Sequence, residues 1–304
     1  NILQKFNFYK KRYKKIKKKL NIIFEKNIVY VSDNIGFLYA YDYVRNKIIW
    51  AKNFKVPFRS NLKIVKDKLA AANQNNNLYI IDKNSGDNLK LIPTEETIIK
   101  NDFINNLSAD EENLYFLNTY GSLYSIEIDS KKINWFINLN QSIELNPSNL
   151  FFGNQIVIEN NKLVVSSNNF TYILDTNNGS IIYKKNFSSL IKPIINNDYL
   201  FLISKNNLLI SMNLRNGKIL FSHDLNDEIA NFLGSKKKVA KFKNIAFIND
   251  GLLIFLENSY ALQLSIDGKI QKIIKLPSKI NTLPIFIKNQ ILFADSNNKI
   301  AVMN

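Results

Sequence analysis

The chain has 304 residues, of which 46% are hydrophobic, and a formal net charge of +16 at neutral pH. This apolar share is typical of a globular protein rather than a disordered one. The absence of cysteine excludes disulfides, thiol catalysis and cysteine-ligated metals, and no apolar run approaches the roughly 18 residues that a membrane-spanning helix needs.

The first predicted element is a strand over residues 2–8, and a strongly basic run follows it. Residues 10–19 hold eight cations in ten positions. This run is either a solvated, self-repelling connector or an electrostatic arm for anionic lipid headgroups or an acidic protein surface. We expect at most a weak contact with an anionic membrane surface through residues 10–19.

From residue 27 onward, short apolar segments rich in β-branched residues alternate with turn residues. The clearest copy of this pattern predicts strands over 27–32, 36–42 and 47–54, and the next copy predicts strands over 68–72 and 78–82. Segments of four to eight residues separated by Asn, Asp and Gly are typical of β-hairpins. No convincing helical periodicity interrupts them, so we expect a chain without helices.

Turn chemistry agrees with this interpretation. Asn-Gly or Asp-Gly pairs end at Gly179, Gly217 and Gly268. Such pairs accept positive φ angles at little cost, which favours type I′ hairpin turns.

The end of this unit recurs seven times, at intervals of 38 to 51 residues. The aligned residues are Gln4, Trp50, Lys90, Trp135, Tyr183, Phe221 and Lys272. A period of about 40–50 residues suits a four-stranded propeller blade. We therefore predict an all-β fold, a β-propeller of four-stranded antiparallel blades, with about seven blades present.

The aromatic members of the repeat are the predicted core of the contacts between blades. One blade is too thin to bury both of its faces, so neighbours must stack. We expect four aromatic side chains to pack between sheets, each N–H or O–H with a polar partner. They are Trp50, Trp135, Tyr183 and Phe221.

We predict that residues 1–304 form a single propeller domain, which starts with an orphan outer strand (2–8) and ends with an incomplete blade (283–304). The last unit offers three strands, over 283–287, 290–294 and 299–302. Either the orphan strand completes this blade and closes a seven-bladed ring, which removes two sheet edges, or the parent protein has eight blades. We expect closure.

The segment Asp42-x-x-x-Asn46-Lys47-Ile-Ile-Trp50, with Ala40 before it, resembles the tryptophan-docking repeat of quinoprotein-like (PQQ-type) propellers. That repeat usually reads Ala-x-Asp-x-x-Thr-Gly-Lys-x-x-Trp. Asp175 and Gly179 supply part of another copy, whereas Lys90 and Lys272 stand where the Trp belongs.

Among non-enzymatic propellers of this type, the chain is similar to the BamB family of outer-membrane β-barrel assembly lipoproteins. Members of that family are anchored through an N-terminal cysteine, and whether such a cysteine or a signal peptide lies upstream here stays open. The resemblance implies a periplasmic location at the outer-membrane face and a scaffold that binds the central barrel-insertion subunit. It also implies eight blades, whereas seven are visible here. We carry over the fold and the scaffold role, and no binding residue.

The sequence offers no catalytic, cofactor-binding or metal-ligating residue, and we expect no cofactor. Quinone dehydrogenases of similar fold bind calcium through clustered carboxylates and carry a vicinal cysteine pair, but the Glu pairs here are only Glu95-Glu96 and Glu111-Glu112. His223 is the only histidine, so any catalytic triad would depend on it. Neighbouring side chains of a strand alternate in direction, so Asp224 should point away, and we expect a surface or turn-proximal histidine.

Only four of the 41 basic residues are arginine, which is the residue favoured for reading bases and phosphates. We therefore expect no specific nucleic-acid partner, although a second basic cluster lies at 236–243. The prediction is a monomeric, non-catalytic protein-binding scaffold, an accessory subunit of outer-membrane protein assembly. The alternatives are a quinone- or ligand-binding propeller enzyme, and a basic propeller that binds polyanions or membrane surfaces.

Overall fold

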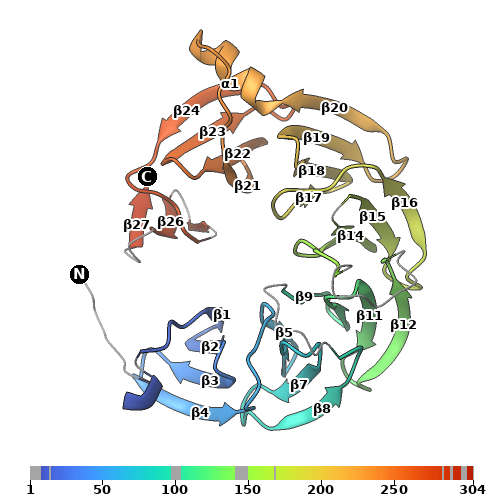
Figure 1. Cartoon of the computed structure of the whole chain (residues 1–304), viewed down its shortest axis with the longest axis vertical. Coiled ribbons are helices and arrows are strands. Elements are labelled where there is room, and N and C mark those ends of the chain that lie inside the picture. The colour runs from blue at the N-terminus through green and yellow to red at the C-terminus, as the bar shows by residue number, and fades with distance from the viewer. Residues whose placement is uncertain are drawn as a thin grey trace. The chain divides into compact units, whose positions relative to one another are not determined.

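The computed structural model describes residues 8–13, 15–96, 104–140, 150–167, 169–282, 284–287, 290–295 and 300–303. In these ranges the chain forms seven antiparallel sheets, six with four strands and the last with three (Figure 1). The predicted fold class, an all-β propeller with about seven blades of four antiparallel strands, is confirmed. The chain divides into two compact units, Asn1–Ile156 with Thr176–Gly179, and Val157–Asp175 with Ser180–Asn304.

The described part of the first unit contains three sheets, preceded by a 3-10 helix, η1 (Lys11–Tyr13). Its strands are β1 (Leu20–Glu25), β2 (Ile28–Asp33), β3 (Phe37–Asp42), β4 (Lys47–Asn53), β5 (Lys63–Val65), β6 (Lys68–Ala72), β7 (Leu78–Asp82), β8 (Asn88–Ile92), β9 (Asn106–Ala109), β10 (Asn113–Leu117), β11 (Ser122–Glu127) and β12 (Lys132–Asn138). Strands that follow one another in the sequence are neighbours in each sheet, so each sheet is a series of hairpins.

The second unit repeats this arrangement in four sheets among its described residues. Its strands are β13 (Val157–Glu159), β14 (Lys162–Ser166), β15 (Thr171–Asp175), β16 (Ile181–Lys185), β17 (Ile194–Asn196), β18 (Tyr199–Ile203), β19 (Leu208–Asn213), β20 (Ile219–Asp224), β21 (Phe242–Ile248), β22 (Gly251–Leu256), β23 (Tyr260–Leu264), β24 (Ile270–Lys275), β25 (Ile285–Ile287), β26 (Gln290–Ala294) and β27 (Ile300–Met303). The last three form the three-stranded sheet.

The N-terminal strand predicted over 2–8 lies outside the described residues, apart from Phe8, which is not in a strand. Its pairing with the last blade stays a prediction. In the part of the chain that the structure describes, no helix combines the length and the apolar character needed to cross a bilayer.

One helix, α1 (Leu225–Leu233), contradicts the expectation of a chain without helices. Asp224 caps it, because its side chain accepts the backbone N–H of Asn226 at 2.9 Å and of Asp227 at 3.3 Å. Gly234 ends it in the left-handed conformation, and the N–H of Ser235 turns back to a carbonyl of the last turn. Nine residues are too few to show a clear helical spacing of hydrophobic side chains, but the capping residues Asp224 and Gly234 are both visible in the sequence.

The hairpin turns between third and fourth strands follow a common plan. In one, the Asp82 carboxylate accepts the N–H of Asn84 at 2.8 Å and of Ser85 at 2.9 Å, and Gly86 completes the turn with φ +75°. The predicted type I′ turns are wrong, because only the glycine of each Asn-Gly or Asp-Gly pair has positive φ (Gly179, Gly217 and Gly268). A type I′ turn needs two such residues.

A β-bulge interrupts the pairing of the third and fourth strands in all six four-stranded sheets. The extra residue is Ile49, Leu89, Asn134, Ile182, Leu220 or Gln271. The residue after each bulge is the one aligned in the sequence repeat, from Trp50 to Lys272. Because a bulge bends its strand and re-aims a side chain, the repeat marks a structural position as well as a sequence pattern.

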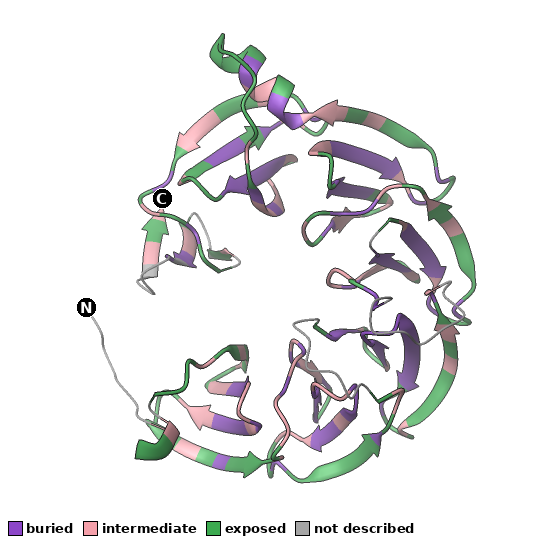
Figure 2. Ribbon diagram, in the orientation of Figure 1, coloured by how far each residue is buried: buried purple, intermediate pink, exposed green. Residues whose placement is uncertain are grey.

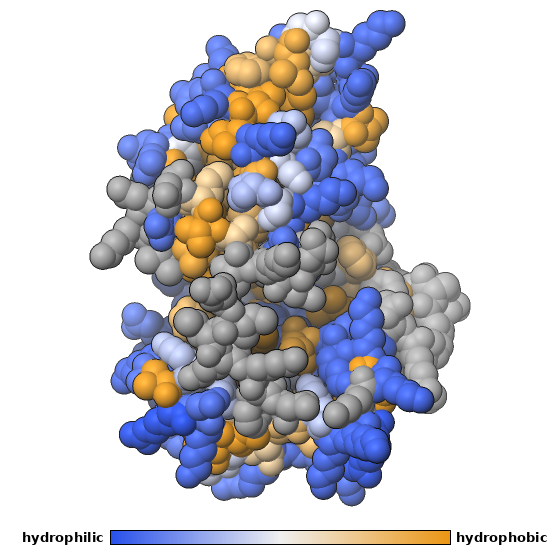
Figure 3. Space-filling view, turned by 90° about the vertical axis from the view of Figure 1, so that its left-hand side faces the viewer, coloured by the Kyte–Doolittle hydropathy of each residue, from blue (hydrophilic) through white to orange (hydrophobic). Residues whose placement is uncertain are grey.

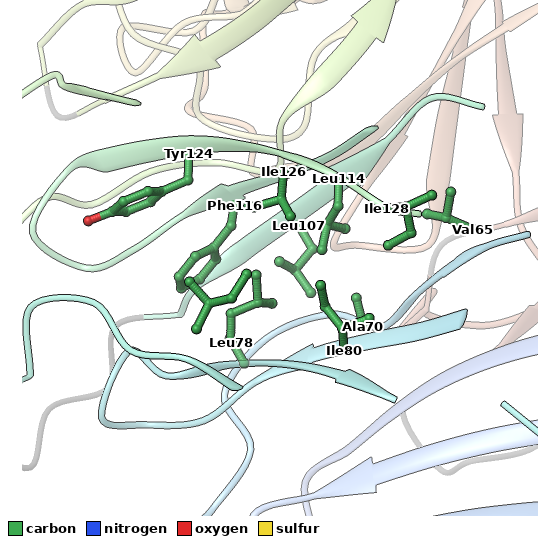
Figure 4. Close-up of a cluster of buried hydrophobic side chains, with 12 residues drawn as sticks. Val65, Ala70, Leu78, Ile80, Leu107, Leu114, Phe116, Tyr124, Ile126 and Ile128 are labelled. Atoms are coloured by element: carbon green, nitrogen blue, oxygen red, sulfur yellow. The ribbon is translucent and has the colours of Figure 1, made fainter. Parts of the chain in front are cut away.

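Burial is concentrated in the second and third strands of each four-stranded sheet, while the fourth strands are mostly exposed (Figure 2). Between the β5–β8 and β9–β12 sheets, side chains from both sides meet in one cluster (Figure 4). Leu78 and Ile80 from one sheet and Leu107, Leu114 and Phe116 from the other are each at most 1% exposed. Burying each such side chain stabilises the fold by about 1.5–3 kcal/mol, so the space between these sheets is core rather than a ligand cavity.

Candidate protein-binding surfaces

The aromatic residues of the repeat serve the contacts between sheets. The Trp50 ring lies against the Gly86 turn, and its Nε1–H donates to the Lys83 carbonyl at 2.9 Å. A Cβ atom added to Gly86 would lie 2.5 Å from Trp50 Cε3. The ring therefore fills the space that a side chain at Gly86 would need.

The other three aromatic residues repeat this arrangement against Gly179, Gly217 and Gly268. Trp135 Nε1–H donates to the Thr176 carbonyl at 2.8 Å, and the Tyr183 hydroxyl donates to the Arg215 carbonyl at 2.8 Å. The prediction that these rings pack between sheets with a polar partner for each N–H or O–H is confirmed. They are structural, so they leave the binding surfaces to loops and to residues outside the repeat.

His223 also takes part in this packing. Its ring stacks on Phe221 with 4.8 Å between centroids, and its Nε2 lies 3.1 Å from the Asp267 carbonyl in the following turn. Asp224 is committed to the cap of α1. The turn-proximal histidine expected from the sequence is confirmed.

Of the two Glu pairs, the structure places Glu95 in a polar cluster. Its carboxylate accepts hydrogen bonds from Ser122 Oγ at 2.5 Å, Asn118 Nδ2 at 2.6 Å and the Tyr124 hydroxyl at 3.0 Å. Burial raises the pKa of Glu95, but these hydrogen bonds outweigh burial and hold the pKa below its usual value. Glu95 thus ties the segment after β8 to the β10–β11 hairpin. Within the described ranges, no three His, Asp or Glu side chains are placed to hold a metal ion.

The basic run at 10–19 lies on the first sheet and is held there by its neighbours. The Phe8 ring stacks on Tyr39 with 4.1 Å between centroids, and the Tyr9 hydroxyl donates to the Asp33 carboxylate at 2.7 Å. The Asn34 side chain accepts the Lys19 N–H at 2.9 Å and donates to the Lys17 carbonyl at 3.1 Å.

Several cations of this run face solvent. Lys10, Lys11, Lys15 and Lys17 are exposed, and they have no carboxylate partner among the residues that the structure describes. Exposed cations without carboxylate partners attract anions and acidic groups, so the described part of this run is a candidate binding surface.

The second basic cluster, 236–243, belongs to an insertion between β20 and β21 that also contains α1. The loop after the helix turns back, and the N–H of Ala240 donates to the side chain of the buried Asn226 at 2.8 Å. Lys237 bridges Asp224 at 2.8 Å and Asp227 at 3.0 Å. The hydrogen bond and charge of Lys237 lower the pKa of Asp224 despite its partial burial.

The helix and its loop form one wall of a groove, and the third sheet of the second unit, β21–β24, forms the floor. Hydrophobic atoms are exposed between hydrophilic ones at the top of Figure 3, the end where Figure 1 places α1. The sequence indicated the lysines of this surface but not the groove, since its walls come from separate segments.

Comparisons with known proteins connect the chain to one family and to a widespread fold. A protein-family model described as "Outer membrane protein assembly factor BamB" matches residues 144–270. No curated protein matches the sequence. The crystal structure of BamB from Moraxella catarrhalis has a TM-score of 0.76 and 13% identity, covering 93% of this chain and 83% of that chain.

Two further solved structures have similar folds. The computationally designed Ika8 protein has a TM-score of 0.74 and 11% identity, covering 93% of this chain and 83% of that chain. The C-terminal WD40 domain of Sif2 has a TM-score of 0.67 and 12% identity, covering 94% of this chain and 81% of that chain.

In all, 1505 chains of solved structures match this fold, so the fold alone does not select a function. The sequence match is more selective, and it spans the docked Tyr183 and Phe221, helix α1 and the 236–243 cluster. The chain is therefore a BamB-like β-propeller with PQQ-type repeats, similar in sequence to the BamB family over residues 144–270.

Proposed function

We propose that the chain is a non-catalytic, protein-binding scaffold, an accessory subunit of outer-membrane protein assembly. The observation that carries this proposal is the match of residues 144–270 to the family described as outer membrane protein assembly factor BamB. The proposed location is the periplasm, at the outer-membrane face, and the proposed partner is the barrel-insertion subunit of the assembly machinery.

The geometry supports a scaffold mechanism. Docked rings such as Trp50 and Trp135 tie sheets to neighbouring turns, and this rigidity lowers the entropic cost of presenting a surface to a partner. The loops and the insertion beside α1 remain exposed on that rigid support. Such a scaffold acts as a monomer that holds its partner, and its residues perform no chemical step.

A direct binding measurement tests the proposal. Isothermal titration of the purified chain with the periplasmic part of the barrel-insertion subunit from the same bacterium should give saturable binding with a Kd of about 10 μM or tighter. Absence of binding at about 100 μM, by a chain that melts cooperatively, would contradict the scaffold role. Addition of pyrroloquinoline quinone with calcium should leave the Tm unchanged, and a rise in Tm would favour the enzyme alternative instead.

A second candidate function, weak binding to anionic membrane surfaces, is favoured by the ordered cations of residues 10–19. The chain should bind phosphatidylglycerol vesicles more strongly than phosphatidylcholine vesicles, and salt should weaken this binding. The Lys15→Glu and Lys17→Glu double variant should lose it, whereas the control pair Lys47→Glu and Lys218→Glu should not. Equal binding by both pairs would remove residues 10–19 from this role.

A further inference from the structure

The groove beside α1 has an apolar interior. Its volume is about 410 Å³, a size typical of sites that receive a ligand or several side chains. Leu256, Leu262 and Ile273 line its floor, and Ile229, Leu233 and Val239 line the wall that the insertion supplies.

Part of this apolar wall lies open to solvent. Leu233 is 58% exposed and Val239 is 80% exposed, although both lie beside buried residues of the sheet. Adjoining exposed apolar side chains with a polar rim are typical of a surface that binds a partner.

The charged side chains that line the groove have one sign. Lys236 and Lys238 line it, and no lining residue is acidic. Between these two, Lys237 turns to the helix N-terminus, where it pairs with Asp224 and Asp227. The carboxylates of Asp224 and Asp227 are therefore neutralised by Lys237, and the charges of Lys236 and Lys238 remain for an external group.

We propose that this groove binds an acidic amphipathic helix of a partner protein. The apolar side chains of that helix, spaced i, i+3, i+4 and i+7, would fill the space between Leu233 and the sheet, and its carboxylates would meet Lys236 and Lys238. This inference rests on the proposed function only in that the chain binds proteins.

The shape and rim of the groove favour a peptide over a lipid surface. A trough between a helix and a sheet accepts a single rod-like element, whereas a bilayer surface is met by a protruding apolar face. The lining also includes polar side chains, Ser235, Asn258 and Tyr260, which can bond to the polar groups of a peptide.

Synthetic peptides test the proposal without knowledge of the natural partner. The probe is a fluorescein-labelled peptide of about 15 residues, with Leu at the helical spacing above and Glu on the opposite face. One comparison peptide has Lys in place of every Glu, and another has the same composition with the Leu residues distributed around the helix. In fluorescence anisotropy at low salt, the probe should bind at least about tenfold more tightly than either comparison peptide, and added salt should weaken it.

Matched variants of the whole chain place the binding site. Leu233→Ser should weaken binding about tenfold, because it removes an apolar anchor, and the Lys236→Glu and Lys238→Glu double variant should weaken it at least as much. The controls are Leu220→Ser, at a residue that is 52% exposed on β20 outside the groove, and Lys218→Glu. Each control should bind within about twofold of the unchanged chain.

Three results would overturn the proposal. The first is equal affinity for the acidic and basic peptides. The second is unchanged probe binding by the groove variants. The third is that the chain binds phosphatidylglycerol vesicles but not the probe, and that the groove variants abolish the vesicle binding. This result would make the groove a lipid site. Binding to the barrel-insertion subunit is measured separately. A chain that binds this subunit but not the probe would therefore contradict only the proposal for the groove, not the scaffold role.

Discussion

Substitution of Gly86 by alanine tests the docking of the Trp50 ring. Gly86 has φ +75°, a region where a side chain costs about 1–2 kcal/mol. The added Cβ would lie 2.5 Å from Trp50 Cε3 and 2.6 Å from Cδ2, whereas carbon atoms pack at about 3.5–4.0 Å. The ring must therefore move by about 1 Å, which strains its packing by about 1–3 kcal/mol and breaks its bond to Lys83, worth about 1 kcal/mol. We expect Gly86→Ala to destabilise the fold by roughly 3–6 kcal/mol.

Gly234 provides the matched control. It also has a left-handed conformation, with φ +58°, but a Cβ built there meets no atom within 4 Å. Gly234→Ala should therefore cost only the backbone penalty of about 1–2 kcal/mol. In a Trp50→Ala background the clash is gone, so Gly86→Ala should cost about as little there as Gly234→Ala.

Urea unfolding followed by circular dichroism gives the free energy of unfolding for each variant. The double-mutant cycle of Trp50 and Gly86 should yield a coupling energy of about 2–4 kcal/mol. If Gly86→Ala cost no more than Gly234→Ala, or if the cycle gave no coupling, the ring would not be docked as described.

Three further predictions follow from individual contacts. Because hydrogen bonds lower the folded-state pKa of Glu95, its contribution to stability is present above the unfolded pKa of about 4.3 and is lost as pH falls through the lower folded value. Below about pH 5, the Tm should therefore decrease less steeply with falling pH for Glu95→Gln than for the unchanged chain. Parallel curves of Tm against pH would contradict this. Asn226→Ala removes the acceptor of the Ala240 N–H, so it should cost about 1–3 kcal/mol and speed tryptic cleavage of the 236–243 loop, and an unchanged cleavage rate would exclude this anchor. Tyr183→Phe keeps the ring but removes the bond to the Arg215 carbonyl, so urea unfolding should report a loss of about 0.5–1.5 kcal/mol; a loss of several kcal/mol would mean that the ring itself had moved.

The sequence predicts the blade contacts well because their determinants are local. The bulge, the aromatic residue after it and the glycine of the hairpin each lie within a few residues of a turn. This is why six aligned positions, Trp50 to Lys272, were placed in the correct register. The same local view failed for the turn type, because side chains such as that of Asp82 recruit two backbone N–H groups and lengthen the turn.

The groove and the Glu95 cluster could not be predicted, because their parts are distant in the sequence. Leu233 and Leu262 line the same groove from segments that each resemble ordinary core. The donors to Glu95 come from residues 23 to 29 positions away, so its neighbours gave no sign of its partners. Helix α1 could not be predicted for a different reason. Its capping residues are visible in the sequence, but nine residues are too few to show the helical spacing of hydrophobic side chains.

The docking of a ring from one sheet on a glycine of the next has a consequence for how such proteins evolve. The two halves of each contact belong to different blades, so each ring depends on the turn of its neighbour. Loss of one half should also release selection on the other. The second sheet fits this expectation, since Lys90 replaces its aromatic residue and Lys131, with φ +57°, occupies the glycine position of the following hairpin. Substitutions at the ring of one blade and at the turn glycine of the next should therefore occur together.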